Sequence, residues 1–217
     1  MPYTTSEFFA GLDLGQSQDF TALAIAERIT SHYTQKELYY FGVAQPPLPQ
    51  YYIRYLERLK LGTPYPEQVR HVKALIERDP LKDKVKLALD FTGVGRPVCD
   101  MFREAQMPCF LIPVLIHGGN KVTNEGLQYN VPKRDLVSVT QVLLQSNRLQ
   151  IAEALPEAAT LVKEMLNFKV KIDPKTAHDS YEAWREGVHD DLVLSVALAL
   201  WIAERGPTPP VVVKYVA

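Results

Sequence analysis

Residues 187–193, which read GVHDDLV, lead into the longest apolar run of the chain, residues 192–203. Ser195 alone interrupts that run, which predicts a helix packed on more than one side. Asp190 and Asp191 then lie in its first turn, where the helix dipole favours negative charge by ~0.3–1 kcal/mol for each acid. Helix capping is one explanation for the pair. The other is a cation site, because adjacent carboxylates raise each other's pKa until a cation neutralises them.

Composition and charge describe an ordinary globular protein that suits one domain. The chain has 217 residues, of which 47% are hydrophobic and 23% charged, and this length allows one substantial core. Its 24 Lys and Arg nearly balance its 25 Asp and Glu, so contact with nucleic acid would have to come from a local basic patch. No apolar run reaches the ~20 residues that span a bilayer, and the N-terminus lacks a signal pattern. We therefore expect a cytoplasmic protein with no membrane partner.

Apolar stretches in the N-terminal part predict an antiparallel meander. Residues 8–15 form an expected strand that is apolar on both faces and interrupted by Asp13, and residues 20–28 follow after a turn. We expect a third strand at residues 37–44, which contain Tyr39, Tyr40, Phe41 and Val43. Short turns between successive strands favour antiparallel pairing. Residues 51–61 are ambiguous between helix and strand, and their Tyr and Ile content favours a strand.

The remaining chain alternates helices and strands, which predicts parallel pairing. A strand at residues 85–90, a helix at 96–106 and a strand at 109–114 form an expected right-handed parallel unit. Further helices are expected at residues 64–78, 133–145 and 154–166, and short strands at 149–151 and 168–172. Residues 116–132 are rich in Gly and Asn and are expected to be a mobile loop, and residues 208–217 a tail or short edge strand.

Three apolar elements carry an acid at or near one end. Asp13 lies within a strand where an unpaired charge costs several kcal/mol, and Asp90 closes a second strand at the carboxyl end, where ligands of parallel sheets bind. If these strands are neighbours, the two side chains lie together, and the helix led by Asp190 and Asp191 can add a third carboxylate. Taken singly, Asp13 also fits a turn former and Asp90 a helix cap.

Such a cluster of carboxylates has a definite chemistry. Hard oxygen ligands suit Mg²⁺ or Mn²⁺ and do not suit Zn²⁺. Two such ions ~4 Å apart hold a phosphodiester, activate water on one side and stabilise the leaving oxygen on the other. The two cysteines, Cys99 and Cys109, lack metal-ligand spacing and are expected in the core.

Ordered motifs in the chain resemble those of RNase H-like nucleases. Residues 11–15 (GLDLG) and 19–21 (DFT) are similar to the first strand and hairpin of that superfamily. More narrowly, the chain resembles the nuclease domain of phage large terminase subunits, and the segments that carry this resemblance are 89–95 (LDFTGVG), 131–136 (VPKRDL), 161–164 (LVKE) and 187–193. The resemblance covers about residues 7–205.

The resemblance implies an α/β fold with a mixed β-sheet, antiparallel in its first three strands and then parallel, flanked by helices. It implies an endonuclease that cuts concatemeric viral DNA during packaging with two Mg²⁺ or Mn²⁺ ions. By the family pattern, Asp13, Asp90 and Asp191 are the catalytic metal ligands and Asp190 is an auxiliary one. The implied partners are double-stranded DNA and the terminase ATPase, small terminase subunit and portal, in a bacterial host cell that carries the phage or prophage.

One feature of complete large terminases is missing from the chain. It has no Gly-Lys pair and hence no Walker A loop, so we expect residues 1–217 to form a single RNase H-like nuclease domain without an ATPase domain. The same motifs are also compatible with other functions. One is a Holliday-junction-resolvase-like nuclease. From other classes come an actin-like ATPase or sugar kinase, which also begins with an Asp-Leu-Gly strand, and a catalytically silent scaffold.

Basic side chains are the candidates for contact with DNA phosphates. The candidates are Lys121, Lys133 and Arg134, with solvated surface charge as the alternative. Arg54, Arg58 and Lys60 share a face if residues 51–61 form a strand, and we expect that face to be solvated.

Two further side chains are candidates for auxiliary roles. His189 precedes the acidic pair, where it would assist proton transfer, orient a carboxylate, or make a structural hydrogen bond. Thr21 follows the first turn and is expected to brace the first hairpin.

Overall fold

The computed structural model describes residues 2–15, 19–93, 96–167, 171–172, 179–180 and 190–206. Within them eight strands form one sheet: β1 (Tyr3–Asp13), β2 (Ala22–His32), β3 (Gln50–Arg58), β4 (Val85–Asp90), β5 (Phe110–His117), β6 (Thr123–Glu125), β7 (Gln128–Pro132) and β8 (Leu149–Ile151). The helices are α1 (Gln35–Phe41), α2 (Tyr65–Ile76), α3 (Arg96–Glu104), α4 (Lys133–Gln145), α5 (Ala158–Asn167) and α6 (Asp191–Arg205). A separate strand pair consists of β9 (Lys171–Ile172) and β10 (Asp179–Ser180).

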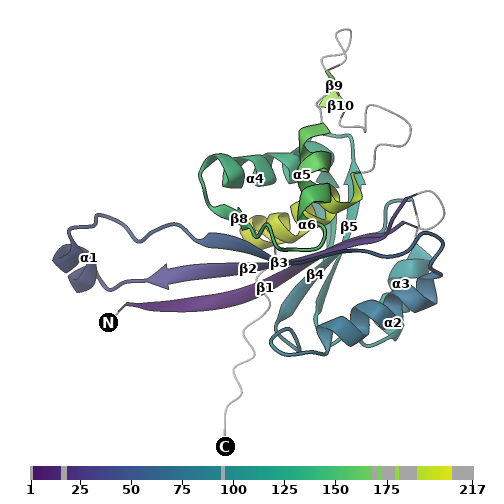
Figure 1. Cartoon of the computed structure of the whole chain (residues 1–217), viewed down its shortest axis with the longest axis horizontal. Helices are drawn as coiled ribbons and strands as arrows, with labels where there is room; N and C mark the ends of the chain where they lie inside the picture. The colour runs from purple at the N-terminus through teal and green to yellow at the C-terminus, as the bar shows by residue number, and fades with distance from the viewer. Residues whose placement is uncertain are drawn as a thin grey trace, which may run out of the picture.

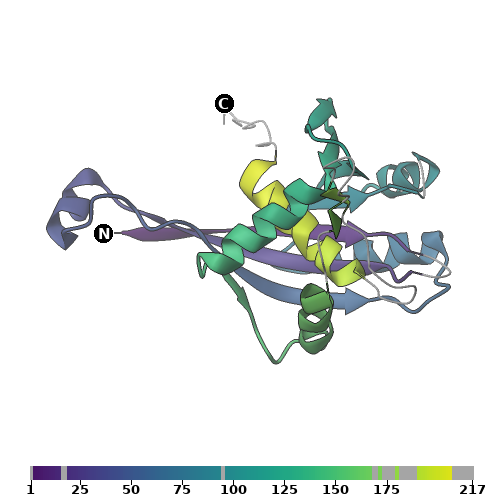
Figure 2. The ribbon, with the colours of Figure 1, turned by 90° about the horizontal axis from the view of Figure 1, so that it is seen from above.

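The sheet lies between two layers of helices. Helices α4, α5 and α6 cover one face, and α2 and α3 cover the other (Figure 1). Seen from above, α6 crosses the strands and contacts β1, β2 and β4 (Figure 2). The strand order is β6-β7-β5-β4-β1-β2-β3-β8, so β1 and β4 are neighbours in the middle of the sheet.

Strand directions agree with the sequence prediction of a mixed sheet. β1, β2 and β3 pair antiparallel in turn. On the other side of β1, the strands β4, β5 and β7 follow in parallel, while β8 is parallel to β3 and β6 is antiparallel to β7. The strand predicted for residues 51–61 is confirmed as β3, and it completes the antiparallel trio.

The strand predicted at residues 37–44 is wrong, because the segment forms helix α1. Thr34 and Glu37 make a capping box in which the Thr34 side chain accepts from the Glu37 amide and the Glu37 carboxylate accepts from the Thr34 amide. Gly42 ends the helix in the left-handed region at φ 66°. These capping signals outweigh the β propensity of the aromatic residues between them.

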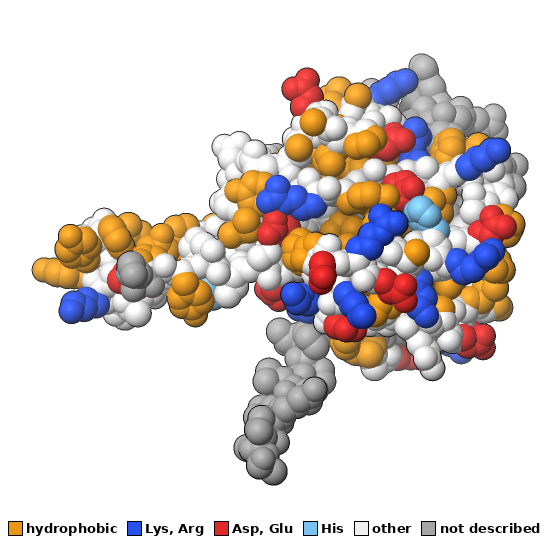
Figure 3. All heavy atoms as spheres, turned by 60° about the horizontal axis from the view of Figure 1, so that its bottom comes forward, with side chains coloured by type: hydrophobic (Ala, Val, Ile, Leu, Met, Phe, Trp, Pro, Cys, Tyr) orange, Lys and Arg blue, Asp and Glu red, His pale blue; other side chains and the backbone are white. Residues whose placement is uncertain are grey.

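Helix α1 lies at the tip of an arm formed by the outer ends of β1 and β2 (Figure 1). Its aromatic residues pack against little of the protein: Tyr39, Tyr40 and Phe41 are 90%, 82% and 54% exposed. Figure 3 shows hydrophobic side chains gathered on this arm. The aromatic residues that suggested a strand therefore belong to an exposed surface.

The segment at residues 116–132, predicted as a mobile loop, contains ordered strands. β5 continues to His117, and β6 and β7 form a hairpin that turns at Gly126, which has φ 60°. β7 pairs in parallel with β5 and so extends the sheet. Gly118, Gly119 and Asn120 lie in the short connection from β5 to β6, and only Gly126 lies in the turn of the hairpin.

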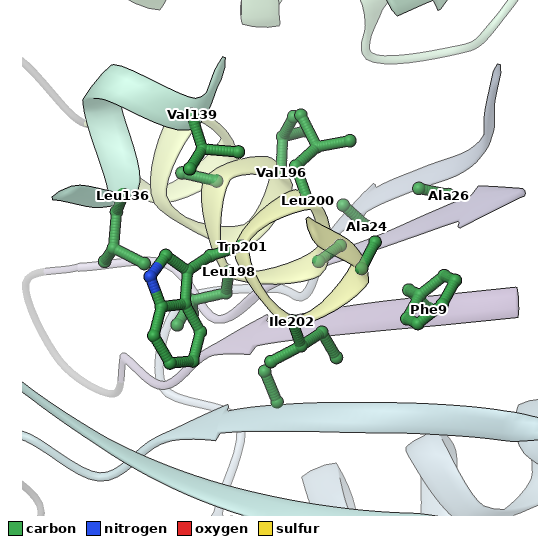
Figure 4. Close-up of a cluster of buried hydrophobic side chains, with 14 of the residues drawn as sticks. Phe9, Ala24, Ala26, Leu136, Val139, Val196, Leu198, Leu200, Trp201 and Ile202 are labelled. Carbon is green, nitrogen blue, oxygen red and sulfur yellow. The ribbon is translucent and has the colours of Figure 1, made fainter. Parts of the chain in front are cut away.

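The apolar run of α6 forms the centre of one core. Val196, Leu198, Leu200, Trp201 and Ile202 are all buried, packing between the sheet and α4 (Figure 4). The prediction of a helix buried on more than one side is confirmed. Among the described residues, no helix is long and apolar enough to cross a membrane.

Candidate functional site

Two carboxylates lie side by side where β1 and β4 end. The strands pair in parallel with Leu12 opposite Leu89, so Asp13 and Asp90 follow at the same carboxyl edge of the sheet. Asp90 is buried, with 6% of its surface exposed. Its Oδ1 accepts a hydrogen bond from the Thr92 amide at 2.8 Å, which holds the turn after the strand.

Both carboxylates belong to the face of the sheet that α6 covers. Side chains alternate between the two faces of a strand. Phe9 and Ala88 belong to the core beneath α6, whereas Leu12 and Leu89 belong to the core beneath α2 and α3. Positions 13 and 90 therefore share the α6 face, and the spacing of apolar residues along each strand determines which way the acids point.

The first turn of α6 brings the acidic pair to the same edge. Asp191 is buried, and Asp190 occupies the N-cap position but makes no capping hydrogen bond with its side chain. Instead, Asp190 Oδ2 pairs with Lys133 Nζ at 2.8 Å. The capping explanation for Asp190 is therefore not what the structure shows, and Lys133, at the start of α4, supplies a cation to the acids.

The carboxylates repel one another strongly. Burial raises the pKa of Asp13 well above its ordinary value, and repulsion from Asp90, Asp191 and Asp190 raises it further, while Lys133 acts in the opposite direction. Burial also raises the pKa of Asp90 to about 6, against the Thr92 hydrogen bonds and Lys133. The three elements thus concentrate more negative charge than one lysine balances.

The donor set fits a hard divalent cation. Its atoms are carboxylate oxygens, which Mg²⁺ and Mn²⁺ prefer, and an added cation relieves the repulsion that raises the pKa of Asp13. Within the described residues, no group of three His, Cys, Asp or Glu side chains is arranged so that it could hold a metal ion. Asp13 is nevertheless close enough to Asp90, Asp191 and Asp190 for their charges to raise its pKa.

The predicted phosphate contacts have different surroundings. Lys121 is exposed. Arg134 donates to the backbone oxygen of Asn120 at 2.8 Å, which ties its side chain to the preceding loop. Lys133 is only 21% exposed and faces the acids through Asp190. His189 lies outside the described residues.

Thr21 contacts the loop that follows Asp13. Its Oγ1 accepts from the Gly15 amide at 3.0 Å, and it lies within hydrogen-bond distance of Gly15 O and Gln68 Oε1, both at 2.8 Å. Gln68 Nε2 also donates to Gly15 O at 3.0 Å. Sequence reasoning missed Gln68, although a polar residue on the buried face of α2, beside Val69 and before Val72, is a usable signal.

Glu164 was also missed as a site residue. It lies on α5, is buried, and accepts hydrogen bonds from the amides of Leu192 and Val193 in the first turn of α6. Burial is the main cause that raises its pKa to about 7, and Asp191 contributes repulsion. A fifth acid therefore borders the cluster.

The metal-free protein should lose stability as the pH rises through these pKa values. Asp90 titrates at about 6 rather than 3.8, and Glu164 at about 7 rather than 4.5. Because both values are raised by folding, the favourable contribution is present when the acids are protonated and is lost as they ionise, between about pH 4 and pH 7. We expect the melting temperature in EDTA to fall over this range, and to fall less in Asp90→Asn. Equal pH dependence in the two proteins would contradict this.

Searches with the sequence alone find no relatives: no family model matches the chain, and no curated protein matches it. Solved structures do match. The mixed sheet, with three antiparallel strands followed by parallel ones and helices on both faces, is an RNase H-like fold.

The structures that share this fold include the nuclease domain of the large terminase subunit of the bacterial virus Sf6. That domain matches with a TM-score of 0.56 and 11% sequence identity, over 89% of this chain and 87% of that one. A point mutant of the Sf6 domain with calcium matches at 0.58 and 12%, over 89% and 88%. Another with manganese and β-thujaplicinol matches at 0.53 and 13%, over 91% and 87%. At this level of identity the likeness shows a common fold.

Proposed function

We propose that this chain is a single nuclease domain that hydrolyses phosphodiester bonds of double-stranded DNA as a divalent-metal-dependent endonuclease. The observation that carries the proposal is the position of Asp13 and Asp90 at one edge of the sheet, with Asp191 close enough to raise the pKa of Asp13. The fold in which they meet is the one found in the Sf6 terminase nuclease domain. An acidic cluster at the carboxyl ends of neighbouring parallel strands, led by a helix N-terminus, is suited to holding cations against a phosphate.

The proposed cofactor is a pair of Mg²⁺ or Mn²⁺ ions, held by Asp13, Asp90 and Asp191 with Asp190 as an auxiliary ligand. Structures of the Sf6 domain with manganese and with calcium support divalent cations as cofactors. Bound ions would activate water for attack and stabilise the leaving oxygen. The sheet fixes two of the carboxylates and α6 the others, so the protein holds the charge in place before the substrate arrives.

Other residues of the chain would hold the DNA and balance charge. Lys121, Lys133 and Arg134 are the proposed phosphate contacts, and Thr21 braces the hairpin after Asp13. Contacts of this kind recognise the backbone and not the bases, so we expect low sequence specificity and strong salt dependence. His189 is proposed as an auxiliary residue beside the acidic pair.

The proposed biological role is cutting of concatemeric phage DNA during packaging, in the cytoplasm of a bacterial host that carries the phage or prophage. The partners proposed with it are the terminase ATPase, the small terminase subunit and the portal. The support for this role is the likeness to a large terminase subunit. Residues 1–217 contain no Walker A loop, so the ATP hydrolysis that drives packaging would be carried out outside these residues.

Plasmid nicking tests the enzymatic proposal directly. We expect supercoiled DNA to be converted to nicked and linear forms with Mn²⁺ or Mg²⁺, and to stay intact in EDTA. Absence of cutting by folded protein that binds Mn²⁺ would contradict the proposal. A four-way junction cut in preference to linear duplex would assign the resolvase alternative, and ATP binding in a calorimeter would favour the actin-like ATPase or sugar-kinase alternative.

A further inference from the structure

The N-terminus of α6 is capped by a residue from another helix. The first amides of a helix have no partner inside it, and a side chain at the N-cap position usually accepts from them. In α6 the N-cap residue, Asp190, does not do this. The carboxylate of Glu164 accepts instead, with Oε2 at 3.0 Å from the Leu192 amide and 3.2 Å from the Val193 amide.

This arrangement separates two tasks that one residue usually performs. Since Glu164 caps the helix, the carboxylate of Asp190 is turned to Lys133, and Asp191 directly precedes the two capped amides. The buried Glu164 is 28 residues from Leu192 in the chain. It therefore fixes the first turn of α6 to α5 at the point where the acidic pair enters the site.

Arg58, at the end of β3, balances the charge of the cap. Its guanidinium lies 3.9 Å from Glu164 Oε1 and 3.4 Å from Glu157 Oε2, and it stacks over the Phe20 ring at 4.7 Å. The prediction that Arg58 belongs to a solvated face is wrong, because it is 21% exposed and enclosed by these groups. A buried carboxylate needs a partner of this kind, since burying an unpaired charge costs several kcal/mol.

The same arginine connects the cap to the first hairpin. Phe20 immediately precedes Thr21, whose backbone oxygen accepts from the Leu59 amide at 2.8 Å. Thr21 in turn bonds Gly15, two residues after Asp13. A continuous set of contacts thus joins the strand that carries Asp13 to the helix that carries Asp191.

We propose that Glu164 is a positioning residue of the metal centre: by capping α6 from outside, it sets where Asp190 and Asp191 stand relative to Asp13 and Asp90. Arg58 holds Glu164 in place. This inference rests on the proposed function where it concerns catalysis. The property that it predicts most directly is the affinity for the metal ion. Residues that orient metal ligands without touching the metal typically change affinity or activity by ~10–100-fold when replaced.

Glu164→Ala and Glu164→Gln separate positioning from charge. The Gln amide oxygen has the shape to accept from Leu192 and Val193, so Glu164→Gln should bind Mn²⁺ nearly as wild type. Ala removes the cap, and we expect Mn²⁺ affinity to fall by ~10–100-fold. The kcat for nicking should fall, whereas the KM for DNA should change little. Amide hydrogen exchange at Leu192 and Val193 should accelerate in the Ala variant alone.

Glu157→Ala is the matched control, because it removes the other carboxylate beside Arg58 and leaves the α6 cap intact. It should keep wild-type Mn²⁺ affinity. Folded Glu164→Ala with unchanged affinity would overturn the inference, and so would a Gln variant that loses as much affinity as the Ala variant. If Glu164→Ala fails to fold, Glu164→Asp takes its place, because the shorter side chain withdraws the carboxylate from the Leu192 and Val193 amides and should lower Mn²⁺ affinity. Unchanged affinity in folded Glu164→Asp would then overturn the inference. A wild type that binds Mn²⁺ but cuts no DNA would refute the proposed function and leave the positioning role testable.

Discussion

Asp13→Asn is expected to abolish metal-dependent nicking and to raise the melting temperature of the metal-free protein. Burial and repulsion from Asp90, Asp191 and Asp190 hold the pKa of Asp13 well above its ordinary value. The neutral amide has nearly the same shape and needs no compensating cation, so folding without metal becomes more favourable. The same change removes a charged oxygen donor, and nicking should fall by at least ~10²–10³-fold, as when one preorganised electrostatic group is lost.

A loss of nicking together with a rise in melting temperature in Asp13→Asn distinguishes a cation site from a cluster that only stabilises the fold. Both are measured on one preparation, by plasmid nicking in Mn²⁺ and by thermal melting in EDTA. Asp100→Asn is the control, because Asp100 is exposed on α3 and pairs with Arg103 at 2.8 Å, and it should change neither. Wild-type cutting by Asp13→Asn would remove Asp13 from the mechanism. A lower melting temperature in EDTA would mean that its carboxylate stabilises the fold.

The convergence of acids was predictable because each one ends an apolar element. Asp90 follows a strand buried almost throughout, and Asp191 leads a run that is buried from Leu192 to Ala203. Such apolar elements are buried at the centre of a domain, and the carboxyl ends of neighbouring parallel strands meet at one edge of the sheet. The pairing of β1 with β4 had to be assumed from the sequence, and the structure confirms it.

The side chains that support the acids were not predictable in the same way. Glu164 and Gln68 act on residues 28 and 53 positions away in the sequence, and no local pattern reports such a contact. In the sequence, Arg58 is one of several basic residues on a strand. Only the structure shows that Phe20 and Glu164 of α5 lie beside it. The strand predicted in place of α1 was wrong for a local reason, because the prediction used the aromatic residues, which are exposed, and not the capping box of Thr34 and Glu37.

Gly11→Ala is expected to destabilise the protein by at least ~3 kcal/mol, the upper end of the usual cost of overpacking. A methyl group at this position would lie 2.0 Å from Ser195 O, 2.7 Å from Ala199 N and 2.9 Å from Leu198 Cβ. The first two are backbone atoms of α6, so no side-chain rotation relieves the contact. The helix must move away from β1, which opens the core along its length.

The displacement also reaches the site, because residue 11 shares the α6 face of β1 with Asp13, and α6 carries Asp191. Even the folded fraction of Gly11→Ala should therefore bind Mn²⁺ more weakly than wild type. Urea denaturation and Mn²⁺ titration measure the two effects. Gly118→Ala is the matched control, since nothing lies within 4 Å of a methyl group there, and its stability should stay at the wild-type value. A Gly11→Ala protein as stable as Gly118→Ala would show that α6 does not lie against β1 as closely as this fold requires.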